Sequence, residues 1–127
     1  MRRIVTVLLI LISAFLFCAC GDISELKIIE VDSEKYSQEE IDEAIEVVKD
    51  YFLKNYDDCK LLTIQYAGDG NIDERLGLIL ISDLYTTEQY HSPGSKSPGE
   101  TYTGWEWVMT QNENGKWEIK NMGWYGV

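Results

Sequence analysis

The segment 36–56 constrains the fold most strongly, because its pattern fits an amphipathic helix. Ser37-Gln38-Glu39-Glu40 is a capping box, in which the Ser37 hydroxyl accepts a hydrogen bond from the backbone of Glu40 and the Glu40 side chain accepts one from the backbone of Ser37. Apolar residues then recur at intervals of three and four: Ile41, Ala44, Ile45, Val48, Phe52 and Tyr56. This spacing predicts a helix over 38–56 with one apolar face, which a second layer must bury.

After the helix the hydrophobic period changes to two, which is typical of strands. Leu62, Ile64 and Tyr66 alternate with their neighbours, and turn residues follow at 68–71. Residues 76–84 are nearly all apolar, as in a strand buried on both faces in the middle of a sheet. Residues 86–101 hold both prolines, two glycines and three serines and are predicted to form a loop.

The last two predicted strands form a hairpin whose register follows from their apolar faces. Those faces are Trp105, Trp107 and Met109 on the first strand and Trp117 and Ile119 on the second. A two-residue turn at 114–115 would place the two sets on opposite faces. A three-residue loop at 113–115 pairs Met109 with Ile119 and Trp107 with Asn121, and it unites the apolar face. We predict this register, with the three tryptophans in the core.

The first 19 residues carry the pattern of an export signal, so they are excluded from the fold. Arg2 and Arg3 precede an uncharged run over 4–17, which is shorter than the roughly 20 apolar residues of a membrane-spanning helix. The run ends in Leu16-Phe17-Cys18-Ala19-Cys20-Gly21, which resembles the lipobox of bacterial lipoproteins. Ordinary secretion is the alternative, but it needs a small residue where Phe17 stands.

The lipobox resemblance implies a lipid anchor. Cys20 would be acylated and become the new N-terminus, which would hold the protein on the extracytoplasmic face of the cell membrane. Residues 1–19 are then the signal peptide, and 20–36 the lipidated N-terminus and a tether that contains a possible short strand at 26–31. Residues 37–127 form a single domain of ordinary size.

Charge and cysteine content restrict the functions that this domain can have. The net charge is −11, and loss of Arg2 and Arg3 with the signal leaves −13. Such a field repels nucleic acid and anionic lipid headgroups, so no nucleic acid partner is expected. Cys59 would be the last cysteine left unmodified, so no internal disulfide is possible. Its acidic neighbours would raise a thiol pKa, so we predict a buried residue at the start of a strand.

No sequence pattern for metal, cofactor or nucleophilic chemistry is present. His91 is the only histidine, and it lies in the predicted loop, where a solvated position is expected. Residues 69–74 resemble a calcium loop, but Glu74 stands at the position of the turn glycine and Leu80 at that of the bidentate glutamate. We therefore predict no metal, no cofactor and no catalytic residue.

The C-terminal hairpin carries a second resemblance. Its motifs are Thr101-Tyr102-x-x-Trp105-x-Trp107-Val108, Gly115-Lys116-Trp117-x-Ile119 and Gly123-Trp124-Tyr125. Together with the helix, they resemble small lipoproteins of Gram-positive bacteria that have a cystatin-like or NTF2-like domain of unknown function. The resemblance implies an α+β fold, in which one long N-terminal helix packs on a curved antiparallel sheet of about four strands.

NTF2-like enzymes hold a carboxylate of raised pKa in an apolar pocket, so the strand carboxylates are candidates. They are Asp83, Glu106 and Glu118, but opposite charges across the hairpin explain Glu118 and Lys120 as solvated residues. In the predicted register, Tyr102, Val108, Met122 and Trp124 lie beside Glu106 on the face opposite the core. The predicted loop covers this patch, or the patch is open to a ligand or partner. The candidate ligand-binding residues are therefore Tyr102, Glu106, Met122, Trp124 and Asp83.

Two functions follow from these expectations. The first is a membrane-anchored, non-catalytic module that binds a protein or a small molecule through this patch. The alternative is a small-molecule enzyme of the NTF2-like kind, with Asp83 or Glu106 as its acid or base. A desolvated carboxylate would distinguish them, because a base needs a tuned pKa and a docking surface does not. A third hypothesis is self-association through exposed strand edges.

Overall fold

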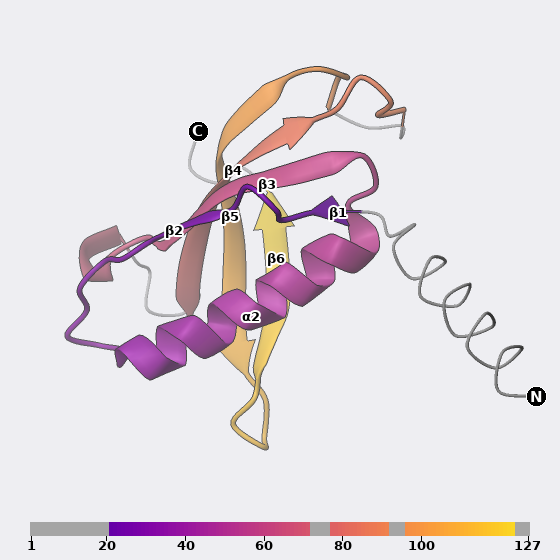
Figure 1. The fold of residues 1–127 in the computed structure, drawn as a ribbon. Helices are drawn as coiled ribbons and strands as arrows, with labels where there is room; N and C mark the ends of the chain where they lie inside the picture. The colour runs from indigo at the N-terminus through magenta and orange to yellow at the C-terminus, as the bar shows by residue number, and fades with distance from the viewer. Residues whose placement is uncertain (1–20, 72–76, 92–95, 124–127) are drawn as a thin grey trace, which may run out of the picture.

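The computed structural model describes residues 21–71, 77–91 and 96–123, which form one α-helix and a six-stranded sheet. In chain order the elements are β1 (Gly21–Asp22), β2 (Lys27–Ile29), α2 (Gln38–Asn55), β3 (Cys59–Tyr66), a short 3-10 helix (Asp69–Asn71), β4 (Leu78–Thr86), β5 (Thr101–Gln111) and β6 (Trp117–Gly123). The sheet curls into a half-barrel, and α2 lies across its concave face (Figure 1).

The sheet is mixed and has the strand order β1-β3-β4-β5-β6, with β2 also paired to β3. β1 and β2 run parallel to β3, and all the other neighbours are antiparallel. The predicted α+β class is confirmed. The N-terminal position of the helix and the antiparallel sheet of about four strands are wrong, because two strands precede the helix. β2 lies within the possible short strand predicted at 26–31, whereas β1 has only two residues, too few to show a period.

The helix forms where the capping box predicts it. Glu40 N donates to Ser37 Oγ, and Ser37 N donates to Glu40 Oε1, both at 3.1 Å. Tyr56 caps the other end, where its N–H donates to the Phe52 carbonyl at 3.0 Å. The buried face of the helix consists of Ile41, Ala44, Ile45, Val48 and Phe52, as the spacing predicts.

The core lies between this helix face and the concave face of the sheet. Trp107 is fully buried at its centre, and its Nε1 donates to Ser82 Oγ at 3.0 Å. Trp105 and Trp117 are also buried, which confirms the assignment of the three tryptophans to the core. β4 contributes alternate residues to this face, from Leu78 and Leu80 onward.

The hairpin register is confirmed near the turn and wrong beyond it. Met109 pairs with Ile119 as predicted, but Trp107 pairs with Met122 instead of Asn121. The register shifts between Val108 and Met109, where Lys120 is an additional residue on β6. An additional residue reverses the alternation of side chains, so Met122 lies on the helix side of the sheet.

A second bulge lies on β5. Ser82 pairs with Trp105 but Leu84 pairs with Tyr102, so β5 has an additional residue in this interval. Gly104, with φ of 72°, lies within it. This bulge places Tyr102 on the helix side as well, where it packs against the core.

The segment assigned to a tether is built into the domain. Gly21 registers with Cys59 and Asp22 with Lys60. A Cβ on Gly21 would lie 2.3 Å from the Phe52 carbonyl oxygen, so β1 packs closely against the end of α2. Cys20 itself lies outside the described residues. Within the described part of the chain, no helix is long and apolar enough to cross a membrane.

Candidate ligand-binding site

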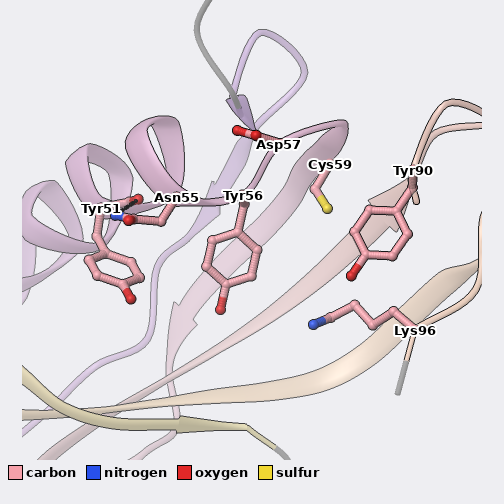
Figure 2. A pocket seen from close by; sticks show the side chains of 7 residues that line it. All are labelled: Tyr51, Asn55, Tyr56, Asp57, Cys59, Tyr90 and Lys96. Atoms are coloured by element: carbon pink, nitrogen blue, oxygen red, sulfur yellow. Dashed lines mark hydrogen bonds between the residues drawn. The ribbon is translucent and has the colours of Figure 1, made fainter. Parts of the chain in front are cut away.

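A hollow of about 270 Å³ lies at the C-terminal end of α2. The end of α2, the start of β3 and the connection between β4 and β5 all contribute to it. Figure 2 shows side chains from these elements facing one another across the hollow. Its lining residues are Tyr51, Asn55, Tyr56, Asp57, Cys59, Tyr90 and Lys96.

Among the described residues that line this hollow, Lys96 alone carries a positive charge. Its ammonium lies 4.0 Å from the ring centroid of Trp105 and 5.6 Å from that of Tyr56. The side chain is half-buried, and burial lowers the pKa of Lys96. Among the described residues, no carboxylate forms a salt bridge with Lys96. Two aromatic faces therefore hold the ammonium, without a neutralising anion from the described chain.

The backbone next to Lys96 is fixed by hydrogen bonds. The Thr86 hydroxyl donates to the Ser97 carbonyl at 2.5 Å, and Glu100 N donates to Thr86 Oγ1 at 3.1 Å. Ser97 N donates to the Tyr102 hydroxyl oxygen at 2.6 Å. Thr86 is buried, and the β5 bulge puts Tyr102 on the helix side of the sheet. Their hydrogen bonds thus position Lys96 over the concave face of the sheet.

The walls of the hollow are aromatic and carry hydroxyl groups. The Tyr56 ring stacks on Phe52 at 4.8 Å and meets Trp107 edge-on at 5.6 Å. Burial raises the pKa of both Tyr56 and Tyr90. These hydroxyls therefore stay protonated at neutral pH. The Tyr56 hydroxyl donates to Met122 Sδ at 3.0 Å, so the Tyr90 hydroxyl is the donor that can serve a ligand.

Cys59 lies at the start of β3 and is buried, as predicted. Burial, with smaller contributions from Asp58 and Asp57, raises the pKa of its thiol to about 11, although Lys96 acts in the opposite direction. At neutral pH the thiol is protonated and is not an activated nucleophile.

These groups together favour a small anion that carries an apolar or aromatic body. Lys96 supplies the charge, Tyr90 supplies a hydroxyl donor, and the aromatic rings supply apolar walls. Among the described residues, no group of three or more His, Cys, Asp or Glu side chains could hold a metal ion.

The structure separates the residues that were predicted to share a ligand-binding face. The bulge on β5 places Tyr102 on the helix side, and the bulge on β6 does the same for Met122. The prediction that these two residues lie opposite the core is therefore wrong. Glu106 and Asp83 lie on the other face, where Glu106 pairs with Ile81. Glu106 is half-buried, and burial raises its pKa. Trp124 lies outside the described residues.

The sequence does not mark Lys96, Tyr56 or Tyr90 as residues of a binding site. Lys96 stands between Ser95 and Ser97 in a loop rich in proline and glycine, where a solvated lysine is the ordinary expectation. Only the hydrogen bonds of Thr86 and Tyr102 bring it onto Trp105. His91, in the same connection, is exposed, and a ring nitrogen contacts the Gln89 carbonyl, so its predicted solvated position is confirmed.

No family model, no curated protein and no solved structure matches this chain.

Proposed function

We propose that this chain is a membrane-anchored extracytoplasmic lipoprotein whose domain is a non-catalytic module for a small anionic ligand. The observation that carries the proposal is the half-buried ammonium of Lys96, which lies over Trp105 and Tyr56 without a carboxylate partner among the described residues. Removing a cation from water is costly unless an opposite charge compensates for it. An anionic ligand would supply that charge.

Magnitudes favour an anion over the ring contacts alone. Cation–π contacts contribute about 2 kcal/mol at most when they are desolvated. An anion about 4 Å from the ammonium attracts it by roughly 4 kcal/mol at an effective dielectric constant near 20. The rings therefore hold Lys96 in place but leave its strongest possible interaction unused.

The location and the finer fold assignment are part of the proposal. The lipobox resemblance at 16–21 supports acylation of Cys20 and attachment to the outer face of the cell membrane. A single helix on the concave face of a curled sheet supports the cystatin-like or NTF2-like assignment. The strand β1 and the parallel pairing of β1 and β2 with β3 are additions to the predicted pattern.

Binding of small anions to matched lysine variants tests the proposal. Benzoate and inorganic phosphate are titrated against the protein, and tryptophan fluorescence reports binding because Trp105 lies under Lys96. We expect saturable binding of at least one probe to the wild type and to Lys116→Met, whose substitution lies in the distant hairpin turn. Lys96→Met should bind at least about tenfold more weakly, which corresponds to about 1.4 kcal/mol. Equal affinity of the two variants would contradict the anion site.

The enzyme alternative rests on Glu106, because burial raises the pKa of this carboxylate. Glu106 lies on the sheet face away from the hollow, so it would need a different pocket from that of Lys96. A side-chain carboxyl NMR titration of Glu106, followed by Glu106→Gln in an activity screen, tests this alternative. It fails if Glu106 titrates at its ordinary value.

A further inference from the structure

We propose that the anion is the headgroup phosphate of an anionic phospholipid in the leaflet that carries the lipid anchor. This inference rests on the proposed function, because it needs both acylation at Cys20 and the anion site at Lys96. It adds the source of the ligand. The supporting observations are the position of β1 beside the hollow, its close packing, and the charge of the domain.

The anchor point lies next to the hollow. Gly21 follows Cys20 directly in the chain and registers with Cys59, which lines the hollow. Consecutive Cα atoms are about 3.8 Å apart, and neighbouring strands about 4.8 Å. Two such steps total roughly 9 Å, which is comparable with the thickness of a headgroup layer, about 5 to 8 Å. The hollow therefore lies within reach of the headgroups around the anchor.

β1 is a fixed attachment rather than a slack tether. Gly21 packs so closely on the end of α2 that a Cβ would lie 2.3 Å from the Phe52 carbonyl oxygen. Asp22 registers with Lys60 on β3, and its carboxylate accepts a hydrogen bond from Ser24 N at 2.8 Å. Figure 1 shows β1 beside the C-terminal end of α2, the end that contributes Tyr56 and Asp57 to the hollow. The anchored end and the hollow therefore face the membrane together.

The charge of the domain favours a single headgroup over general adsorption. Net charge is −11 for the chain and −13 without Arg2 and Arg3, so an anionic leaflet repels the surface as a whole. A polybasic adsorption mechanism is thus excluded, but one phosphate can still meet the one ammonium of Lys96. The anchor would compensate for the repulsion, because it makes binding effectively intramolecular. Lys96 would repel the quaternary ammonium of a choline headgroup, so a lipid with net negative charge is the better match.

Acetylation of individual lysines in the lipidated, full-length protein tests this inference. The protein is reconstituted in phosphatidylcholine vesicles with increasing fractions of phosphatidylglycerol, and mass spectrometry gives the acetylation rate of each lysine. Lys60 is the control within the same molecule, because it pairs with Asp22 near the anchor but does not line the hollow. We expect phosphatidylglycerol to slow acetylation of Lys96 severalfold and saturably, with Lys60 unchanged.

The other outcomes separate the inference from the proposed function. Inorganic phosphate or benzoate is added to vesicles of phosphatidylcholine alone. If these soluble anions protect Lys96 while phosphatidylglycerol does not, the anion site stands and the lipid source is overturned. If neither protects Lys96, both proposals are overturned. Equal slowing of Lys60 and Lys96 by phosphatidylglycerol would indicate a general surface effect and would also overturn the lipid source.

Discussion

At the scale of single residues, Asp69 connects three parts of the chain. Its Oδ1 accepts hydrogen bonds from the Ser33 and Tyr66 hydroxyls, and its Oδ2 accepts one from Glu34 N, all at 2.7 Å. These bonds hold the segment between β2 and α2 against the end of β3. The same bonds, led by that from Ser33, lower the pKa of Asp69 to about 2.

The lowered pKa of Asp69 predicts a defined pH dependence of stability. The folded state holds the charged carboxylate more strongly than the unfolded state, whose aspartate pKa is near 4. The contribution is therefore present above about pH 4 and is lost as the pH falls toward 2. Asp69→Asn should have a lower urea midpoint at neutral pH, and its midpoint should fall less between pH 5 and pH 2 than that of the wild type.

The matched control for this prediction is Asp50→Asn. Asp50 is exposed on α2 and makes none of the bonds that Asp69 makes. An equal effect of the two substitutions on the pH dependence would show that the Asp69 contacts do not stabilise the fold.

At the scale of elements, the start of α2 depends on its capping box. Ser37 and Glu40 each satisfy a backbone N–H that the helix itself leaves without a partner. Ser37→Ala should lower the free energy of unfolding by about 1 kcal/mol, measured by urea denaturation followed by circular dichroism. Glu40→Gln keeps a side-chain acceptor and should lose less. A Ser37→Ala variant as stable as the wild type would contradict this role of the cap.

The two bulges show what strand patterns can predict. The alternation along 105–109 and 117–119 correctly predicts the shared apolar face and the pairing of Met109 with Ile119. The alternation of apolar and polar residues gives no sign of an inserted residue. A prediction based on it therefore keeps the same alternation through the bulge at Lys120 on β6 and through the bulge at Gly104 on β5. Residues beyond each bulge are therefore assigned to the wrong face of the sheet. For this reason Tyr102 and Met122 are predicted on the face opposite the core, although they lie on the helix side.

At the scale of the whole molecule, the buried bond between Trp107 and Ser82 joins β5 to β4 at the centre of the core. Ser82→Ala leaves the buried indole N–H without its acceptor, which should cost about 1–3 kcal/mol. Trp107→Phe loses packing as well as the donor. The double variant should be less destabilised than the sum of the two single variants, because the second change removes the group left unsatisfied by the first.

Denaturation of the wild type and the three variants measures this coupling. Thr110→Ala, at a half-buried position on β5, is the control substitution, because this side chain has no bond to Ser82. Strict additivity of Ser82→Ala and Trp107→Phe would show that the hydrogen bond adds nothing beyond packing.

The helix, the strands β3 to β6, the buried tryptophans and the buried Cys59 can be predicted from local periodicity and neighbouring residues. The alternation predicted for β3 is wrong at Leu62, because a register shift between Leu61 and Thr63 puts Leu61 in the core instead. Other features depend on contacts between distant parts of the chain. β1 is too short to carry a pattern and exists because β3 pairs with it. The bulges on β5 and β6 move the side chains beyond them to the other face of the sheet, and the alternation of apolar residues does not predict them. Lys96 becomes a candidate ligand contact only because residues far apart in the chain, Tyr56 and Trp105, form an aromatic surface beneath it.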